Sequence, residues 1–346
     1  MQPFTLDTVR TKAESIYQYM TEKSYADWGM DIGQWDWVPG VGVISILRYY
    51  EQTKDAKVLD YLKNWTETYR AKAEHVKVIN GMAPYAIYPS LYEYTGDSYY
   101  KEAAEQIGNW MLTEAPRTRE GAFEHTVTEK AAFPEQVWAD TIFMAVLFLA
   151  RLARVTKNKT YAEEALKQTE LHLRLLQDPA TGVLFHGWNC AEGHHMSAAR
   201  WTRANAWVAV GVPEIYKELM GLIEFPKEIV ENYQRLMNGL LNYQAPNGLW
   251  HTVMDQKSFY YETSGSAGIA CGILSGIRQG LLGKELRPYA VRSVEAVMEQ
   301  TEYRGKVLGV SGGTPVMPTI EAYNTLEIIP TLYGQGLALM LLSEMI

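Results

Sequence analysis

Two kinds of helical segment alternate along nearly the whole chain, and this alternation limits the possible folds more than any other feature. Segments such as 55–73 and 158–178 are amphipathic and charged, whereas 39–52, 134–155 and 264–282 are apolar on most sides. An amphipathic helix faces water on one side, and a helix that is apolar all round must be enclosed by others. The alternation therefore predicts an inner ring of helices inside an outer ring.

Hydrophobic periodicity predicts twelve helices in total. They are placed near residues 6–24, 39–52, 55–73, 82–95, 97–113, 134–155, 158–178, 198–220, 226–243, 264–282, 284–300 and 328–345. No linker-like or low-complexity stretch separates them. We therefore expect residues 1–346 to form one all-α domain, an (α/α)6 barrel of six helical hairpins.

The connections between these helices also alternate. Inner helices lead to outer ones through short turns that share a Thr-x-Asp/Asn core, in "YEQTKDAKV", "YEYTGDSYY" and "ARVTKNKTY". This core supplies a turn and a helix N-cap. Outer helices return through long segments rich in Gly, His and Trp, and three of these are alike: "GAFEHT", "GVLFHGW" and "GLWHTV". All the long segments should meet at one end of the barrel, its mouth, where loops carry function.

Charge and motif content exclude several classes of protein. The formal net charge is −8 and no Lys/Arg-rich run is present, which argues against nucleic-acid and membrane partners. No run approaches the ~18 apolar residues of a membrane span. Nucleotide-binding and metal-binding motifs are absent, so we expect no cofactor and no metal. Cys190 and Cys271 fit no redox or metal spacing, and a cytoplasmic protein is the default expectation.

One carboxylate, Asp140, precedes a run from Ile142 to Ala150 that contains no polar residue. Pro134 is expected to open the helix that carries this run. A lone charge beside such a run is costly unless it is capped, paired or used. Asp140 is therefore either a core carboxylate bonded to backbone amides or a catalytic group.

The other candidates lie at the same predicted mouth. They are Trp37 before the first inner helix, Trp138 beside Asp140, His125, His186 and His251 at matching places in the three similar loops, and Arg203 and Trp207 four residues apart on one helix face. Each has a structural alternative, such as a buried ion pair for Arg203 and core packing for the histidines and tryptophans. Their convergence on one mouth favours function, because packing roles alone would scatter between both ends.

Six stretches resemble, in order, the unsaturated rhamnogalacturonyl hydrolases of glycoside hydrolase family 105, relatives of the unsaturated glucuronyl hydrolases of family 88. They are "PRTREGAFEHT", "QVWADTIFMAVLFLAR", "GVLFHGW", "WTRANAW", "GLWHTV" and "YGQG". The resemblance runs from about Trp35 to the C-terminus. It implies an (α/α)6-barrel catalytic domain that removes a 4,5-unsaturated uronic acid, galacturonyl or glucuronyl, from the non-reducing end of lyase-generated oligosaccharides. The implied partner is thus an unsaturated uronyl oligosaccharide of about disaccharide size.

The family's chemistry, placed on Asp140, uses one acid. Ordinary glycosidases need a pair of carboxylates, whereas Asp140 would protonate C4 of the vinyl ether and then accept a proton from the water that adds at C5. The acid must be neutral when substrate arrives, and an apolar setting disfavours its charged form. Asn80 stands where some relatives carry a second aspartate, which argues against a two-carboxylate mechanism. Ala139 and Ala204 also depart from the family's Trp-Asp-Asp and Arg-Gly-Asn patterns.

The resemblance also suggests substrate-binding roles. Arg203 is the candidate to hold the uronate carboxylate through a charge-assisted hydrogen bond. His125 and His186 would contact sugar hydroxyls or orient water, and Asn80 is a further candidate for substrate binding. The rings of Trp37, Trp138 and Trp207 would stack on the sugar or wall the pocket. Two other functions remain open on the same barrel: a sugar epimerase that uses histidines as acid and base, and a carbohydrate-binding protein without catalysis.

Overall fold

The computed structural model describes residues 4–22, 25–130 and 132–346. The α-helices are α1 (Leu6–Thr21), α2 (Trp37–Thr53), α3 (Ala56–Tyr69), α4 (Tyr88–Thr95), α5 (Ser98–Thr113), α6 (Leu147–Thr156), α7 (Lys159–Leu176), α8 (Thr202–Leu219), α9 (Lys227–Leu241), α10 (Thr263–Arg278), α11 (Arg287–Glu299) and α12 (Leu332–Ser343). The shorter elements are the 3-10 helices η1 (Arg70–Ala73), η2 (Asn80–Ile87), η4 (Lys284–Leu286) and η5 (Glu321–Thr325), the π-helix η3 (Ile142–Val146), and the strands β1 (Gln136–Trp138) and β2 (Gly187–Asn189).

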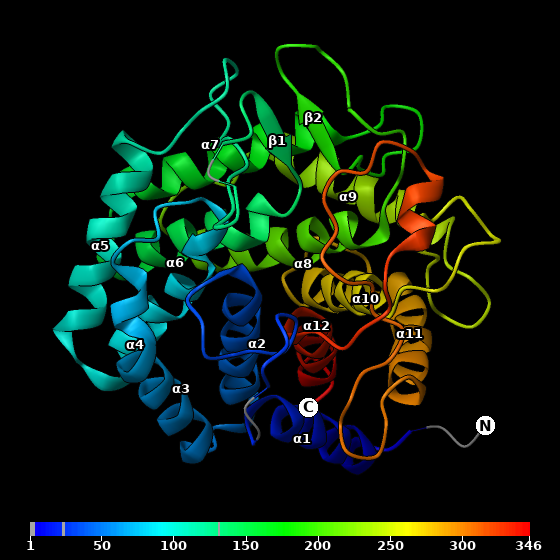
Figure 1. The fold of residues 1–346 in the computed structure, drawn as a ribbon, viewed down its shortest axis with the longest axis horizontal. Helices are drawn as coiled ribbons and strands as arrows, with labels where there is room; N and C mark the ends of the chain where they lie inside the picture. Colours follow the sequence, from blue (N-terminus) through cyan, green and yellow to red (C-terminus); the bar gives the residue numbers. More distant parts are fainter. Residues whose placement is uncertain (1–3, 23–24, 131) are drawn as a thin grey trace.

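The even-numbered helices close into an inner ring. α2 packs against η2, which leads into α4; η2 packs against η3 and α6, α6 against α8, α8 against α10, α10 against α12, and α12 returns to α2. The odd-numbered helices lie outside, and Figure 1 shows α1, α3, α5 and α11 at the periphery around α2, α10 and α12. The fold is therefore an α/α barrel with inner and outer rings, as the alternation of helix types predicts.

Burial follows the two helix types. Every residue of α12 from Leu332 to Ser343 is buried, and α10 is buried from Thr263 to Gly276. In the outer helix α9, by contrast, buried residues form one stripe that includes Ile229, Tyr233 and Leu236. An inner helix contacts neighbours on all sides, so only a sequence without a polar face can occupy that position.

The Thr-x-Asp/Asn turns have the predicted geometry. Asp55, Asp97 and Asn158 are the N-caps of α3, α5 and α7, and each side chain accepts a backbone N–H two residues on at 2.9–3.0 Å. The residue before each cap is left-handed, with φ of 55° at Lys54, 72° at Gly96 and 57° at Lys157. The same turn thus joins an inner helix to an outer one at all three positions.

The loops that return from outer to inner helices also repeat a turn, four times rather than three. Gly121, Gly182, Gly248 and Gly305 all have φ between 81° and 88°. At Gly182 and Gly248 a Cβ would lie only 2.6 Å and 2.5 Å from the backbone oxygens of Arg235 and Arg292. The fourth turn, at Gly305, lacks the histidine that marks the other three in sequence.

The predicted helix 134–155 is wrong in its first part. Residues Gln136–Trp138 form β1, which pairs antiparallel with β2, and helical structure begins only at Ile142. Glu135 has a left-handed φ of 62°, so Pro134 does not open a helix. Val137, Trp138 and Ala139 lie shortly before the apolar run that begins at Ile142, and periodicity alone cannot tell such a short apolar stretch from the start of a helix.

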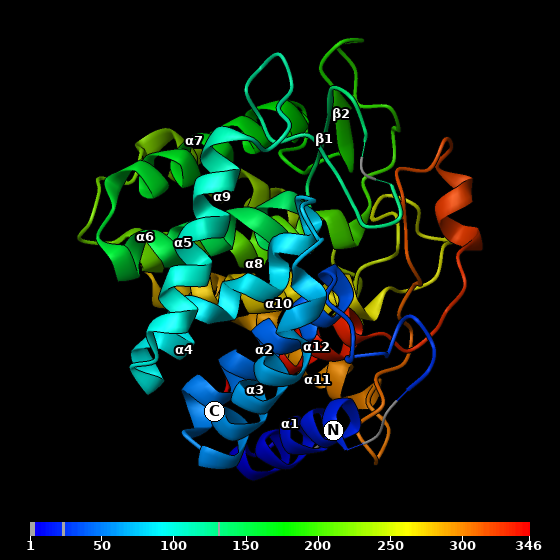
Figure 2. The ribbon, with the colours of Figure 1, turned by 60° about the vertical axis from the view of Figure 1, so that its left-hand side comes forward.

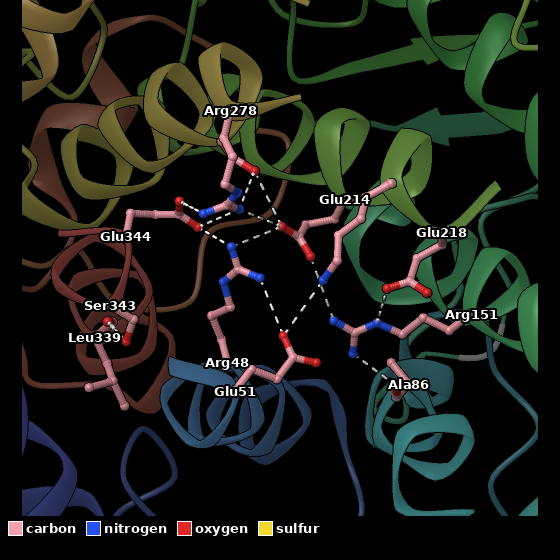
Figure 3. Close-up of polar contacts among 12 residues, drawn as sticks. Arg48, Glu51, Ala86, Arg151, Glu214, Glu218, Arg278, Leu339, Ser343 and Glu344 are labelled. Carbon is pink, nitrogen blue, oxygen red and sulfur yellow. Dashed lines mark hydrogen bonds and ion pairs between the residues drawn. The ribbon is translucent and has the colours of Figure 1, made fainter. Parts of the chain in front are cut away.

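The inner helices run in one direction. Their N-terminal ends face the long loops, and Figure 2 shows β1, β2 and the orange-red 311–330 segment gathered on one side of the molecule. Their C-terminal ends meet in an ion-pair network around Glu214, drawn in Figure 3. Its other central members are Arg48 of α2, Arg151 of α6, Arg278 of α10 and Glu344, the C-cap of α12. Among the described residues, no helix is long and apolar enough to cross a membrane.

Candidate active site

A pocket of about 270 Å³ opens at the mouth of the barrel. Eight of its lining residues are the ones that the sequence predicts: Trp37, Asn80, His125, Trp138, Asp140, His186, Arg203 and Trp207. They come from seven separate elements or loops of the chain. The fold thus brings these eight residues together, while the role of each stays a prediction.

Asp140 lies in the tight turn between β1 and η3 rather than within a helix. Its backbone oxygen accepts the amides of Phe143 and Met144, which begins the helical run behind it. Its side chain is 14% exposed. The Asn80 Nδ2 donates to Asp140 Oδ2 at 2.6 Å. One carboxylate oxygen is therefore held by the Asn80 amide, and the other, Oδ1, faces His125.

His125 stands on the Oδ1 side of Asp140. Its Nδ1 lies 3.6 Å from Oδ1, and its ring stacks on Trp138 with centroids 3.7 Å apart and planes 8° apart. Burial lowers the pKa of His125, and the charge of Asp140 only partly offsets this. The imidazole is therefore neutral near pH 7.

Three buried polar atoms in this corner have no hydrogen-bond partner among the described residues: Asn80 Oδ1, His125 Nδ1 and Asp140 Oδ1. Asn80 and His125 are 2% and 1% exposed. Buried polar atoms are nearly always paired in native proteins, so a cluster of three needs an explanation. The pocket here offers two acceptors and one imidazole nitrogen to a small polar ligand.

His186 directly precedes β2, and its ring contacts the rings of Trp138 and Trp201. Its Nδ1 lies 2.8 Å from the hydroxyl of Tyr323. Burial, with contributions from His125 and Arg203, lowers the pKa of His186 well below its usual value. This histidine is also neutral near pH 7.

Arg203 is 1% exposed and pairs with the fully buried Glu262 at 3.2 Å. Its Nη1 and Nη2 also donate to Ser311 Oγ at 2.6 Å, to the Gly312 oxygen at 2.8 Å and to Thr314 Oγ1 at 3.0 Å. The structure therefore contains the buried ion pair that was the alternative for Arg203. Its contact with a substrate carboxylate stays a prediction.

Sequence reasoning missed part of the pocket wall. Trp28, Phe133, Trp201 and Thr314 also line it. Trp201 directly precedes the Arg203 helix in the quoted "WTRANAW" block, and that position was a usable signal. Trp28 and Thr314 lie in irregular stretches whose place only the tertiary fold decides.

His251 does not line the pocket, although its loop resembles those of His125 and His186. Its Nδ1 lies 2.6 Å from the backbone oxygen of Phe259, and its ring stacks on Tyr261. The repeated loop therefore supplies two pocket histidines and one structural histidine. In the described part of the chain, no three His, Cys, Asp or Glu side chains are grouped to hold a metal ion.

Several helices begin at the pocket. Trp37 begins α2, Asn80 begins η2 and Arg203 is the second residue of α8, and all three line the pocket. The N-terminal end of a helix carries partial positive charge and exposed N–H groups. Inner helices that point the same way add their fields at the mouth, which suits a ligand with a negative charge.

Comparisons with known proteins agree with this geometry. The sequence profile of Glycosyl Hydrolase Family 88 matches residues 9–346. The chain is 35% identical over 341 residues to the unsaturated rhamnogalacturonyl hydrolase YesR of Bacillus subtilis, covering 97% of this chain and 95% of that protein. It therefore belongs to glycosyl hydrolase family 88, and it is a glycoside hydrolase.

More distant proteins extend the comparison. An unsaturated 3S-rhamnoglycuronyl hydrolase of an Alteromonas species is 24% identical, over 90% of this chain and 77% of that protein. A crystal structure of a possible GH105 member from Klebsiella pneumoniae superposes with a TM-score of 0.93 and 28% identity, covering 99% of this chain and 95% of the other. None of these findings favours an epimerase or a non-catalytic binding protein.

Proposed function

We propose that this enzyme removes a 4,5-unsaturated uronic acid from the non-reducing end of lyase-generated oligosaccharides by hydrating the C4=C5 vinyl ether. The observation that carries the proposal is Asp140, the less exposed of the two carboxylates that line the pocket, with one oxygen held by Asn80. Hydration of an alkene needs one group that acts first as acid and then as base. The name of the relative that is 35% identical over nearly the whole chain supports the same reaction.

The contact between Asn80 and Asp140 decides which oxygen carries the proton. Oδ2 accepts the Asn80 amide, so the transferable proton of the neutral acid belongs on Oδ1. Asp140 Oδ1 gives this proton to C4, and positive charge develops at C5 and the ring oxygen. Water adds at C5 and returns its proton to Oδ1, which restores the neutral acid. The hemiketal at C5 then opens and expels the remaining sugar.

The cluster of unpartnered atoms provides a place for the attacking water. A water molecule there donates to Asn80 Oδ1 and to Asp140 Oδ1. It accepts from the Nδ1–H of a neutral His125 ring. The 3.6 Å gap between His125 Nδ1 and Asp140 Oδ1 is too long for a good hydrogen bond, and a shared ligand bridges such a gap. The Asn80 amide thus holds Asp140 through its Nδ2 and accepts the water through its Oδ1.

The pocket's charge and rings suit an anionic sugar. The converging helix N-termini attract the uronate carboxylate, and Arg203 adds a positive charge that Glu262 partly balances. Trp37, Trp138 and Trp207 give flat apolar walls for the sugar faces. The double bond removes the C4 stereocentre, so galacturonyl and glucuronyl units present the same alkene to these walls.

The test is a screen of unsaturated disaccharides produced by several polysaccharide lyases. Hydration removes the conjugated alkene, so ultraviolet absorbance falls as the free sugar appears. Loss of absorbance with at least one substrate, at a rate proportional to enzyme, supports the proposal. Tight binding without any loss across the whole panel would favour a carbohydrate-binding protein, and conversion of saturated sugars instead would favour an epimerase.

A further inference from the structure

The 311–330 segment, between α11 and α12, completes the pocket from a distant part of the chain. Ser311, Gly312 and Thr314 bond the Arg203 guanidinium. Further along, η5 carries Tyr323, and this turn is part of the orange-red ribbon beside the β1–β2 side of the molecule in Figure 2.

Tyr323 is fully buried against the inner face of the pocket. Its hydroxyl lies 2.8 Å from His186 Nδ1, and it accepts the backbone N–H of Met317 at 3.1 Å. Its own backbone oxygen accepts the hydroxyl of Tyr260 at 3.2 Å. Hydrogen bonds therefore hold both the hydroxyl and the backbone of Tyr323 in place.

We propose that Tyr323 is a positioning residue: it donates its hydroxyl proton to His186 Nδ1, holds this ring in the Nε2–H tautomer, and so presents an N–H donor to an oxygen of the bound sugar. This inference rests on the proposed function, because it names the group that meets the substrate. The tautomer itself is a property of the free enzyme.

The direction of the hydrogen bond follows from the other partners of the hydroxyl. An amide N–H can only donate, so Met317 occupies one lone pair of the Tyr323 oxygen. Burial raises the pKa of Tyr323 to about 12, and the hydrogen bond from the Met317 amide acts in the opposite sense. The phenol keeps its proton, and the close acceptor for that proton is His186 Nδ1.

The charge state of His186 makes the tautomer matter. Because burial lowers its pKa well below the usual value, the ring carries one N–H near pH 7 rather than two. With Nδ1 occupied by Tyr323, Nε2 is the nitrogen left for the pocket that His186 lines. The other tautomer would offer the substrate a lone pair where a sugar hydroxyl oxygen or carboxylate needs a donor.

Nitrogen NMR of protein labelled with 15N-histidine reads the tautomer directly. His186→Gln identifies the signals of this ring among the 7 histidines. The expected spectrum has a protonated Nε2 and an unprotonated Nδ1 at pH 7. Tyr323→Phe should introduce the Nδ1–H form, and it should raise KM for an unsaturated disaccharide by roughly tenfold with a smaller change in kcat, as for one lost hydrogen bond.

Tyr233→Phe is the matched control. Its hydroxyl is also buried and lies 3.1 Å from the oxygens of Ala209 and Gly272, away from the pocket. It should lower stability as Tyr323→Phe does, but leave the His186 spectrum and KM unchanged. A wild-type ring protonated at Nδ1 would overturn the tautomer, and an unchanged KM in Tyr323→Phe would overturn the donor role. If no disaccharide is turned over, the proposed function fails, while the spectrum still decides the tautomer.

Discussion

At the scale of single residues, the site depends on an unequal treatment of the two oxygens of Asp140. Asn80 occupies Oδ2 at 2.6 Å, and Oδ1 faces His125 without a partner among the described residues. A carboxylate at position 80 would compete for the same proton, whereas an amide cannot. The replacement that looked in sequence like a missing acid is, in the proposed mechanism, the group that orients the remaining one.

Asp140→Asn tests the acid itself. Asn is nearly isosteric and has no transferable proton, so kcat should fall by ~10²–10⁴ while KM changes little. The loss of ultraviolet absorbance gives both values. Asp60→Asn, at an exposed carboxylate on the outer helix α3, is the control and should keep full activity. A folded Asp140→Asn enzyme that retains a tenth of wild-type turnover would remove Asp140 from the mechanism.

Asn80→Asp tests the orienting contact. The change places two carboxyl groups in hydrogen-bond contact, and such a pair retains one shared proton to higher pH than an isolated acid does. Asn80→Asp should therefore stay active to higher pH than wild type. Asn80→Ser, which removes the amide without adding charge, should lower kcat. Identical kcat–pH profiles in Asn80→Asp and wild type would show that the two side chains do not interact during turnover.

At the scale of elements, close packing of α8 on α10 supports the site. α10 places Gly265, Gly268 and Gly272 along α8, and a Cβ at Gly272 would lie 2.3 Å from the backbone oxygen of Ala209. A Cβ at Gly265 would lie 2.9 Å from the backbone nitrogen of Arg203. Small residues thus let the two helices approach until Arg203 and Glu262, on adjacent inner helices, can pair.

Gly272→Ala should lower the free energy of unfolding by about 1–3 kcal/mol, because the backbone of α8 cannot yield to the new methyl group. Intrinsic helix propensity alone predicts the opposite, a gain of up to about 1 kcal/mol. Gly42→Ala in α2 separates the two effects, since its nearest neighbours would lie at an ordinary 3.6 Å. Urea denaturation should show Gly42→Ala neutral or stabilising; equal behaviour of the two variants would contradict the close approach.

At the scale of the whole molecule, the barrel has two chemically different ends. Helix N-termini and the pocket occupy the mouth, and the ion-pair network around Glu214 occupies the other end, where helix C-termini carry partial negative charge (Figure 3). Arg48, Arg151 and Arg278 come from three inner helices and meet Glu214 from a fourth. The network therefore joins elements that are far apart in sequence and closes the ring.

Glu214→Gln should destabilise the protein by about 3–5 kcal/mol, because it leaves buried guanidinium groups without their counter-charge. Burial acts to raise the pKa of Glu214, but Arg48, Lys217 and Arg151 lower it to about 2. Its contribution is thus complete above pH 4.5 and is lost as the pH falls toward 2. Thermal denaturation from pH 7 to pH 3 should show a smaller loss of Tm in Glu214→Gln than in wild type. Glu231→Gln, in the exposed pair with Lys227, should match wild type throughout.

Local sequence patterns specify the helix types and their order, and through them the barrel. Apolar periodicity and local caps such as Asp55, Asp97 and Asn158 act between near neighbours in the chain, so the pattern carries them directly. The same patterns placed seven of the eight pocket residues at one mouth, because parallel inner helices bring all their N-terminal ends together, and Asn80 came from the family resemblance. The family resemblance added the reaction and the role of Asp140.

The pairings across the pocket, by contrast, arise from contacts between distant parts of the chain. The strand at Gln136–Trp138 depends on a partner strand at Gly187–Asn189. Arg203 forms its ion pair with Glu262 and its hydrogen bond with Ser311 only in the folded chain. His186 is hydrogen-bonded to Tyr323, 137 residues away. His251 shares a loop pattern with His125 and His186 and still turns away from the pocket. Such contacts depend on side chains that meet only after the ring has closed, and no local pattern in the chain encodes which of them will meet.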